Sequence, residues 1–341
     1  MKYYLLSVSK RVNSINIGDY IQALASSQFL PSIDGFVDRE DLKDYDGEEC
    51  KIIMNGWYMH FPVYWPPSTK INPLFVAMHI NILAKERMLM EDSIGYLKKY
   101  EPIGCRDIAT RDMLEANGVD AYFSGCMTLT LGYKYKYNGV REGVYIVDPV
   151  VKLTSRFEKV AWLMNSLLHM KNILKIARKY NRHNDRPWYK LAYVSKFYNT
   201  YRKFFTDETL LNATYIYHES RSYKEYLKTE DDRLNMAESL VKSYSKAALV
   251  VTSRIHCALP CLGLETPVLY LYDDAQAEVS SCRLDGLLQL FNIIHVDDHK
   301  MYSSDINLSD KIDCHTIIRN KDTWRQYAAD LSARCEAFVA D

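Results

Sequence analysis

The chain has 341 residues, of which 48% are hydrophobic and 25% charged, a composition typical of a globular protein long enough for two domains rather than of a disordered one. Basic and acidic residues number 43 each, so no net charge favours binding to nucleic acid. No apolar run reaches the about 18 residues of a membrane-spanning helix. The eight cysteines include no Cys-x-x-Cys pair and the first residues do not read as a secretory signal, so we expect reduced thiols in a cytoplasmic protein.

Predicted strands alternate with predicted helices along the chain. The first half is expected to hold strands at 3–8, 51–54, 75–80 and 144–147 and helices at 19–29, 93–100 and 108–117. The second half is expected to hold a helical segment at 155–206, a helix at 233–246, and strands at 213–217, 247–252, 267–272 and 293–296. This alternation predicts an α/β protein with two Rossmann-like domains facing a cleft, residues 1–150 and 151–320. A final helix in 321–341 is expected to pack back on the first domain.

The most informative segment is Ser253-Arg254-Ile255-His256, which follows the apolar strand predicted at 247–252 and precedes a predicted helix. Such a position binds ligands in α/β proteins, and the free N–H groups of the following helix favour an anion. The Arg254 guanidinium suits a carboxylate or a phosphate, and the His256 imidazole can move a proton near neutral pH. The residues alone leave an alternative open, in which Arg254 forms a surface ion pair and His256 caps a helix.

Four short motifs follow one another in order: Asn16-Ile17-Gly18-Asp19, the segments 103–107 and 124–131, and the run 252–268 that contains Arg254 and His256. In this order they resemble the polysaccharide pyruvyl transferase family, and in particular its bacterial capsular and exopolysaccharide branch. The resemblance implies a glycosyltransferase-B-like pair of domains. The chain departs from the family in segment 55–60, where many relatives have a glycine-rich loop.

The resemblance implies transfer of the enolpyruvyl carbon of phosphoenolpyruvate to two hydroxyls of a sugar, which gives a cyclic pyruvate ketal and phosphate. The donor carries a carboxylate and a phosphate, and a proton must reach its methylene carbon. We therefore expect His256 to be catalytic, and Arg254, Ser253 and Arg106 to bind phosphoenolpyruvate. Arg106 could instead pair with Asp107 or cap a helix. No cofactor is expected beyond this co-substrate.

The first domain is expected to hold the sugar acceptor and the second domain the donor. The candidate acceptor-binding residues are Asn16, Gly18, Asp19, Trp57, Tyr58 and His218. The alternative for Asp19 is a simple cap on the first helix, and Trp57 and Tyr58 could fill a core instead of stacking on a sugar. The nine histidines lack the spacing of a zinc site, so no metal is expected.

Charge is distributed unevenly, because residues 152–206 hold thirteen basic side chains and only the two acidic ones Glu158 and Asp185. Many aromatic and aliphatic residues lie between these charges. A basic amphipathic segment of this composition can lie on an anionic membrane, which would suit an acceptor sugar linked to a lipid pyrophosphate. The equal alternative is that its apolar residues face the core and the basic ones are solvated. Nucleic acid is not expected as a partner, because no reading motif accompanies the segment.

Two other functions remain open at this level. One is a nucleotide-sugar glycosyltransferase of the same architecture, since a fold does not determine its chemistry. The other is a non-catalytic protein that binds anionic glycans through residues 152–206. Only the second alternative predicts that Arg254 and His256 are dispensable.

Overall fold

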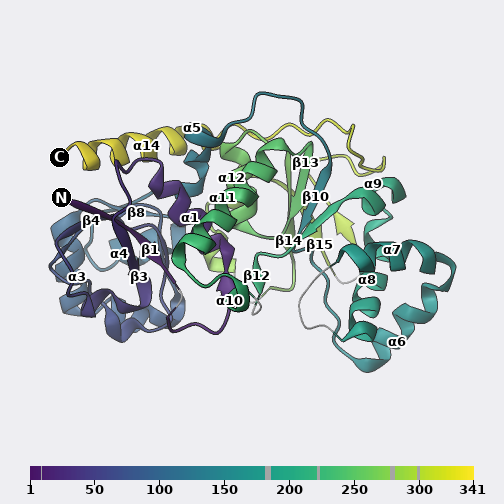
Figure 1. Cartoon of the computed structure of the whole chain (residues 1–341), viewed down its shortest axis with the longest axis horizontal. Coiled ribbons are helices and arrows are strands. Elements are labelled where there is room, and N and C mark those ends of the chain that lie inside the picture. The colour runs from purple at the N-terminus through teal and green to yellow at the C-terminus, as the bar shows by residue number, and fades with distance from the viewer. Residues whose placement is uncertain (9, 181–185, 221–222, 277–280, 298–299) are drawn as a thin grey trace.

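Two parallel sheets flanked by helices form the framework of the molecule (Figure 1). The structure, a computed structural model, describes residues 1–8, 10–180, 186–220, 223–276, 281–297 and 300–341. The α/β class predicted from the sequence is confirmed, and the two sheets are compatible with a glycosyltransferase-B-like arrangement. Within the ranges just given, no helix combines the length and the apolar character needed to cross a bilayer.

The first sheet has two hydrogen-bonded parts, with strand orders β3-β1-β4-β6 and β5-β7-β8-β9, and every pair in it is parallel. Because β4 leads into β5 and β6 into β7 across short bends, each of these pairs acts as one bent strand. The combined order is then 2-1-3-4-5-6 along the chain, which is a doubly wound topology. The strands are β1 (Lys2–Ser7), β3 (Gly35–Asp38), β4 (Cys50–Ile53), β5 (Gly56–Tyr58), β6 (Ile71–Leu74), β7 (Met78–Ile80), β8 (Ile103–Cys105) and β9 (Ala121–Phe123).

The second sheet has the order β11-β10-β13-β14-β15-β16, parallel except for its last strand. Its parallel strands therefore follow the order 2-1-3-4-5, the same winding as in the first sheet. All four residues of β13 are buried, as expected of a strand covered on both faces. The strands are β10 (Val144–Val147), β11 (Thr214–Ile216), β13 (Leu249–Thr252), β14 (Val268–Asp273), β15 (Asn292–Val296) and β16 (Met301–Tyr302).

The strand β10 corrects the boundary predicted at residue 150. Residues 144–147 were expected to end the first domain, but they pair in register with Leu249–Thr252 in the middle of the second sheet. The chain therefore changes sheets between β9 and β10. A short apolar strand carries no mark of the sheet that it joins, because its partner lies about a hundred residues further along the chain.

Helices α1, α11 and α12 fill the space between the two sheets (Figure 1), and one hydrophobic cluster contains residues from all three. A two-stranded antiparallel ribbon, β2 (Ile15–Asn16) with β12 (Glu219–Ser220), ties the loop before α1 to the loop after β11. The α-helices are α1 (Ile17–Ser27), α2 (Lys85–Met88), α3 (Glu91–Leu97), α4 (Ile108–Glu115), α5 (Gly132–Tyr135), α6 (Arg156–Asn165), α7 (Met170–Lys179), α8 (Pro187–Tyr201), α9 (Asp207–Asn212), α10 (Tyr223–Tyr226), α11 (Glu230–Lys246), α12 (Ile255–Gly263) and α14 (Trp324–Ala340).

The last helix, α14, runs back along the first half of the molecule and ends near the N-terminus (Figure 1). Lys51 of β4 donates a hydrogen bond of 2.7 Å from Nζ to the carbonyl of Phe338. The ring of Phe123, at the end of β9, packs edge-on against Tyr327, with 5.1 Å between centroids. These contacts join the final helix to an interior strand and to the last strand of the first sheet.

Helices α6, α7 and α8 form a separate outer lobe between β10 and β11, at the end of the molecule away from the first sheet (Figure 1). This lobe corresponds to the basic segment predicted at 152–206, apart from 181–185, which lie outside the described residues. The rings of Tyr193, Phe197, Tyr198 and Tyr201 are buried in the core beside the second sheet. For these aromatic residues the core alternative is correct, because α8 is covered by its neighbours on most of its length.

Candidate functional site

A cavity of about 570 Å³ lies between the carboxyl ends of the two parallel sheets. The loops after β1, β5, β7 and β8 reach it from one side, and the loops after β11, β13 and β14 from the other. Doubly wound sheets bind ligands at these strand ends, and here both sheets present them to the same space. The β2–β12 ribbon joins the two sides at this place, where the Ile17 amide donates a hydrogen bond of 2.8 Å to the carbonyl of His218.

His256 lies in the first turn of α12 and faces the cavity. Its Nε2 lies 3.4 Å from Nη1 of Arg106. Because a guanidinium can only donate, Nε2 accepts, and the proton of the neutral ring sits on Nδ1. Burial lowers the pKa of His256 well below its usual range, and the charges of Arg106 and Arg283 lower it further. His256 therefore does not cap its helix. Its ring is neutral and lies close to the positive charges of Arg106 and Arg283.

The start of α1 packs directly against His256. A Cβ on Gly18 would lie 3.0 Å from the His256 Cβ and 3.1 Å from its Nδ1, so this position needs a residue without a side chain. Asn16 is the N-cap of α1, since its Oδ1 accepts a hydrogen bond of 3.0 Å from the Gly18 amide. The cap alternative weighed for Asp19 is therefore wrong, because Asn16 occupies that place three residues earlier.

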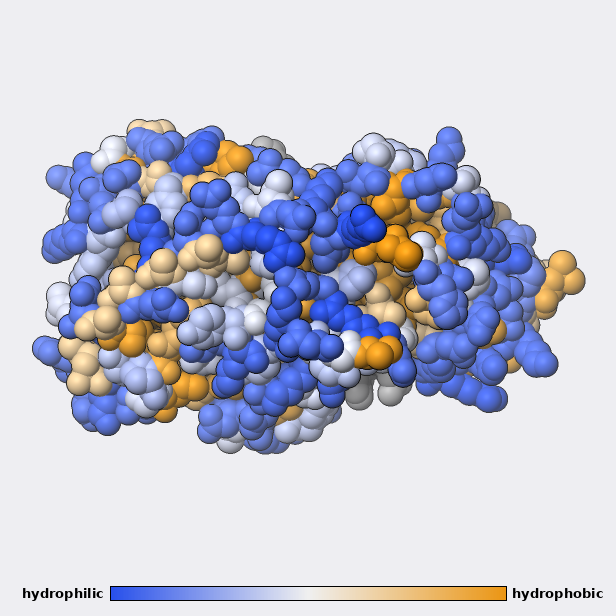
Figure 2. Space-filling view, turned by 90° about the horizontal axis from the view of Figure 1, so that it is seen from above, coloured by the Kyte–Doolittle hydropathy of each residue, from blue (hydrophilic) through white to orange (hydrophobic). Residues whose placement is uncertain are grey.

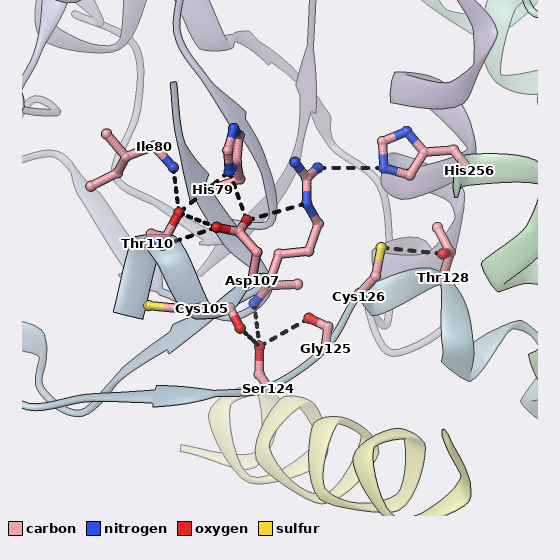
Figure 3. A network of polar contacts seen from close by, with 12 residues as sticks. His79, Ile80, Cys105, Asp107, Thr110, Ser124, Gly125, Cys126, Thr128 and His256 are labelled. Atoms are coloured by element: carbon pink, nitrogen blue, oxygen red, sulfur yellow. Dashed lines mark hydrogen bonds and ion pairs between the residues drawn. The ribbon is translucent and has the colours of Figure 1, made fainter. Parts of the chain in front are cut away.

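Arg106 comes from the end of β8 and is only 1% exposed. Its neighbour Asp107 caps α4 through Thr110 and accepts a hydrogen bond of 2.6 Å from Nδ1 of His79 (Figure 3). The Arg106 Nε lies 3.9 Å from the Asp107 carboxylate, so the predicted pairing of these two residues is long. Among the described residues, the Arg106 atoms Nε and Nη2 have no hydrogen-bond partner. A buried guanidinium with free donors is suited to bind an anion that enters the cavity.

His79 explains why Asp107 does not neutralise Arg106. Burial would raise the pKa of the Asp107 carboxyl, but the His79 hydrogen bond and the charge of Arg106 lower it below its usual value. Burial and the charge of Arg106 also lower the pKa of His79, which is therefore a neutral donor to the ionised Asp107. The carboxylate is thus shared between His79 and the α4 cap, and Arg106 keeps only a distant ion pair.

Arg254 lines the cavity from the residue before α12, and its side chain is partly exposed. Its Nε lies 3.0 Å from Oδ2 of Asp148, at the end of β10, and its Nη2 lies 3.9 Å from Glu219. Asp148 also accepts a hydrogen bond of 2.9 Å from the His218 amide, so one carboxylate positions two predicted site residues. In the sequence, Asp148 is marked only by its position next to the domain boundary predicted at residue 150.

Ser253 does not line the main cavity, although the sequence placed it with the donor. Its Oγ donates a hydrogen bond to the carbonyl of Asp148, and it borders a smaller neighbouring cavity of about 290 Å³. Ser253 and Arg254 alternate in direction along the extended chain, so only one of them can face the main cavity. Ser253 is therefore bound to Asp148, the partner of Arg254, and lies outside the main cavity.

Arg283 and Arg39 also line the cavity, and no sequence motif pointed to either. Arg283 lies in a short 3-10 helix (Cys282–Leu284) after β14, and its buried Nε has no hydrogen-bond partner among the described residues. Arg39 follows β3 and forms ion pairs of 3.3 Å with Asp19 and 3.4 Å with Glu40. A lone arginine between secondary-structure elements gives no signal in a single sequence, since only the fold brings it to the site.

The two aromatic candidates of segment 55–60 separate. Trp57 lines the cavity, with its ring 5.5 Å from the Arg39 guanidinium and 4.4 Å from the ring of His60. Tyr58 is 0% exposed and packs in the core against Trp65, so it is not part of the site. Neighbouring residues of a strand point to opposite faces, which is why only one can reach the cavity.

His218, the remaining acceptor candidate, lines the cavity from the end of β11. Its Nε2 lies 2.8 Å from the Tyr244 hydroxyl.

Within the described ranges, no three His, Cys, Asp or Glu side chains are grouped so as to hold a metal ion. The family model for polysaccharide pyruvyl transferases matches residues 16–275. Neither the curated proteins nor the solved structures contain a match to this chain. The matched range includes His256, Arg106 and Arg254, and it ends before Arg283.

Proposed function

The chain belongs to the polysaccharide pyruvyl transferase family, and we propose that it moves pyruvyl from phosphoenolpyruvate to two hydroxyls of one sugar. The observation that supports this most directly is the convergence of Arg106, Arg254 and Arg283 on the cavity that contains His256. Phosphoenolpyruvate carries a carboxylate and a phosphate, and guanidinium groups bind both kinds of anion in a bidentate manner. Three arginines around one small space are suited to a substrate of this charge.

The reaction requires that protons move while two C–O bonds form. One sugar hydroxyl attacks C2 of the donor as the methylene carbon gains a proton and becomes a methyl group. The second hydroxyl then attacks the same carbon, the C2–O bond to phosphate breaks, and the proton of this hydroxyl leaves with the phosphate. Atoms and charges balance without an oxidant or a cofactor.

His256 is the residue that we assign to this proton transfer. In the free site its neutral ring directs the Nε2 lone pair at Arg106. An anion bound by Arg106 and Arg283 would offset the charges that disfavour a proton on the ring. The same histidine could then accept a hydroxyl proton and pass it to the methylene carbon, as a general base and acid.

The acceptor side is assigned to residues on the wall of the cavity that β5 and the start of α1 form. Trp57 offers an aromatic face, and Asp19 and Asn16 lie at the same wall of the cavity. Within this proposal the product is a pyruvylated capsular or exopolysaccharide unit, made in the cytoplasm from an acceptor that can be linked to a lipid pyrophosphate. Peripheral contact of residues 152–206 with the membrane would bring the enzyme to such an acceptor.

Phosphate release from phosphoenolpyruvate tests the proposal, measured with free and lipid-linked galactosides, glucosides and mannosides. We expect release only with an acceptor, and we expect His256→Ala and Arg254→Ala to abolish it. Arg325→Ala, an exposed arginine on α14, is the matched control and should keep full activity. Absence of release with every acceptor, together with tight binding of a nucleotide sugar, would favour a glycosyltransferase instead. Glycan binding that survives both site variants would favour the non-catalytic alternative.

A further inference from the structure

The outer lobe carries an apolar surface that does not belong to its core. Helix α6 has no fully buried residue. The side chains exposed to solvent on α6 and in the turn after it are Phe157 (85%), Val160 (58%), Met164 (62%), Leu167 (61%) and Leu168 (95%). Phe157, Val160 and Met164 are spaced by three and four residues, which puts them on one side of α6. Leu167 and Leu168 follow in a short 3-10 helix (Leu167–His169) directly after it. We call these five residues the α6 apolar row.

This row differs from the apolar residues that hold the lobe together. Ile173 and Ile176 of α7 and four rings of α8, those of Tyr193, Phe197, Tyr198 and Tyr201, are buried beside the second sheet. Figure 2 shows apolar side chains projecting at the end of the molecule where the outer lobe lies. Large apolar side chains that are scattered singly are normal on a surface, whereas a contiguous row on one helix face marks an interaction site.

The surroundings of the row are basic. Exposed cations on the outer lobe include Arg156, Lys171, Lys175, Arg178, Lys179 and Arg186. The one acidic residue among the described part of 152–206 is Glu158, and it is engaged by Lys196 at 2.8 Å. The lobe therefore offers an exposed, mostly aliphatic strip on a segment whose charge is predominantly positive.

The exposed apolar row and the excess of cations on the outer lobe together indicate which kind of partner it binds. A second copy of the chain would bring two basic surfaces together, which like charges disfavour. Single-stranded nucleic acid binds through stacking on aromatic rings, but four of the five residues in the row are aliphatic. A helix with an apolar face and cationic flanks fits the interface of an anionic bilayer, where the side chains enter the acyl boundary and the cations meet the headgroups.

We propose that the α6 apolar row docks this protein on the surface of an anionic lipid bilayer. The row inserts shallowly, and the lysines and arginines of α6 and α7 supply the attraction to the headgroups. This docking concerns the outer lobe alone and does not depend on the reaction assigned to the cavity. It sharpens the expectation for residues 152–206, because the buried rings of Tyr193, Phe197, Tyr198 and Tyr201 take no part and the exposed residues of the α6 apolar row do.

Flotation of the full chain with vesicles tests the docking. We expect binding to vesicles of phosphatidylcholine with phosphatidylglycerol in equal parts, weak binding to phosphatidylcholine alone, and a decrease as salt is added. The double variant Phe157→Ser, Leu168→Ser should bind about tenfold more weakly or worse, since it removes the two most exposed members of the row. Ile317→Ser, at an equally exposed residue outside the lobe, should bind like the wild type.

Several outcomes would overturn the proposal. Equal binding of the double variant and the wild type would exclude the row as the contact. Equal binding to neutral and anionic vesicles at all salt concentrations would exclude the role of the cations. A dimer in sedimentation that the double variant disrupts, without vesicle binding, would assign the row to self-association. Because phosphate release with a soluble acceptor should be unchanged in the double variant, failure of the docking can be told apart from failure of the proposed reaction.

Discussion

Arg39 and Arg283 line the same cavity, but their surroundings differ. Arg39 lies between the carboxylates of Asp19 and Glu40. Burial acts to lower its pKa, yet these two charges raise it above the usual value. Burial also lowers the pKa of Arg283, and there the charge of Arg106 lowers it further. One guanidinium is neutralised by the protein, whereas the other lies among cations.

This difference separates a structural cation from a binding one. A buried charge is stable when it is paired, and an unpaired one marks a place that a ligand completes. Arg39 thus fixes the start of α1 and the wall that carries Trp57. Among the described residues no carboxylate pairs closely with Arg283 or Arg106, so their positive charge beside His256 is available to the proposed donor anion.

The largest expected effect is on folding, from Arg39→Gln. This change leaves the buried Glu40 and the nearby Asp19 without their cation, and breaking such a pair costs about 3–5 kcal/mol. Urea unfolding should show the loss as a lower midpoint. A variant as stable as the wild type would mean that Arg39 is not held by its carboxylates, and the contrast with Arg283 would fail.

Arg283→Gln should weaken the binding of phosphoenolpyruvate without destabilising the fold. Loss of a charge-assisted hydrogen bond of about 1.5–3 kcal/mol should raise the KM for phosphoenolpyruvate by about 10- to 100-fold. The free energy of unfolding should stay the same or rise, because a repulsive neighbour of Arg106 is removed. If Arg283 binds the phosphate of the donor, inhibition by inorganic phosphate should weaken as the KM rises, while inhibition by pyruvate should change little. The reverse pattern would move Arg283 to the carboxylate of the donor.

Gly18→Ala tests the close approach of α1 to His256. The added methyl group would meet His256 at 3.0 Å, and overpacking of this kind costs about 1–3 kcal/mol. Gly95→Ala in α3 is the matched control, since nothing lies within 4 Å of its new Cβ, and it should stabilise the helix by up to about 1 kcal/mol. Thermal unfolding of both variants gives the comparison. Stabilisation by Ala at both positions would mean that α1 does not press on His256.

Acid should weaken the fold through the buried histidines. The pKa of His256 in the folded state is lowered well below 6.5, so below that pH the unfolded chain takes up a proton that the folded one does not. The free energy of unfolding should therefore fall as the pH drops from about 6.5 toward 4, by at most about 1.4 kcal/mol per pH unit for this residue. His79 acts in the same direction.

The variant His256→Gln measures how much of the pH dependence of the unfolding free energy comes from His256. Its unfolding free energy should depend less steeply on pH between 6.5 and 4 than that of the wild type, while the contribution of His79 remains. An unchanged slope would indicate that His256 is charged in the folded protein despite the cations around it, and its assignment as a neutral base in the free site would be wrong.

The smallest effect is expected at the acceptor wall. Trp57→Ala should raise the KM for the sugar by about 2- to 10-fold, which corresponds to a stacking contribution of about 0.5–1.5 kcal/mol. Tyr58→Phe, one residue further on but buried in the core, should leave that KM unchanged. Equal effects at both positions would mean that the changes act through the fold of β5.

Local sequence patterns were reliable where a property depends on neighbours in the chain. The apolar run at 247–252 and the following Arg254 and His256 are found where the strand, loop and helix were predicted. The alternation of strands and helices indicated parallel sheets for the same reason. Patterns failed where the outcome depends on a distant partner, as for β10, which joined the second sheet, and for Tyr58, which turned to the core.

The sequence by itself determined the α/β class, the family, and two of the arginines at the cavity, Arg106 and Arg254, because strand periodicity and motifs depend on short stretches of the chain. Only the tertiary structure decided which charges are paired. Arg106 and His256 are 150 residues apart in the chain and 3.4 Å apart in the fold. Electrostatic pairing depends on distance in space, which a single sequence does not contain. The contrast between Arg39, which is paired with two carboxylates, and Arg283, which has no such partner among the described residues, is therefore visible only in the folded molecule.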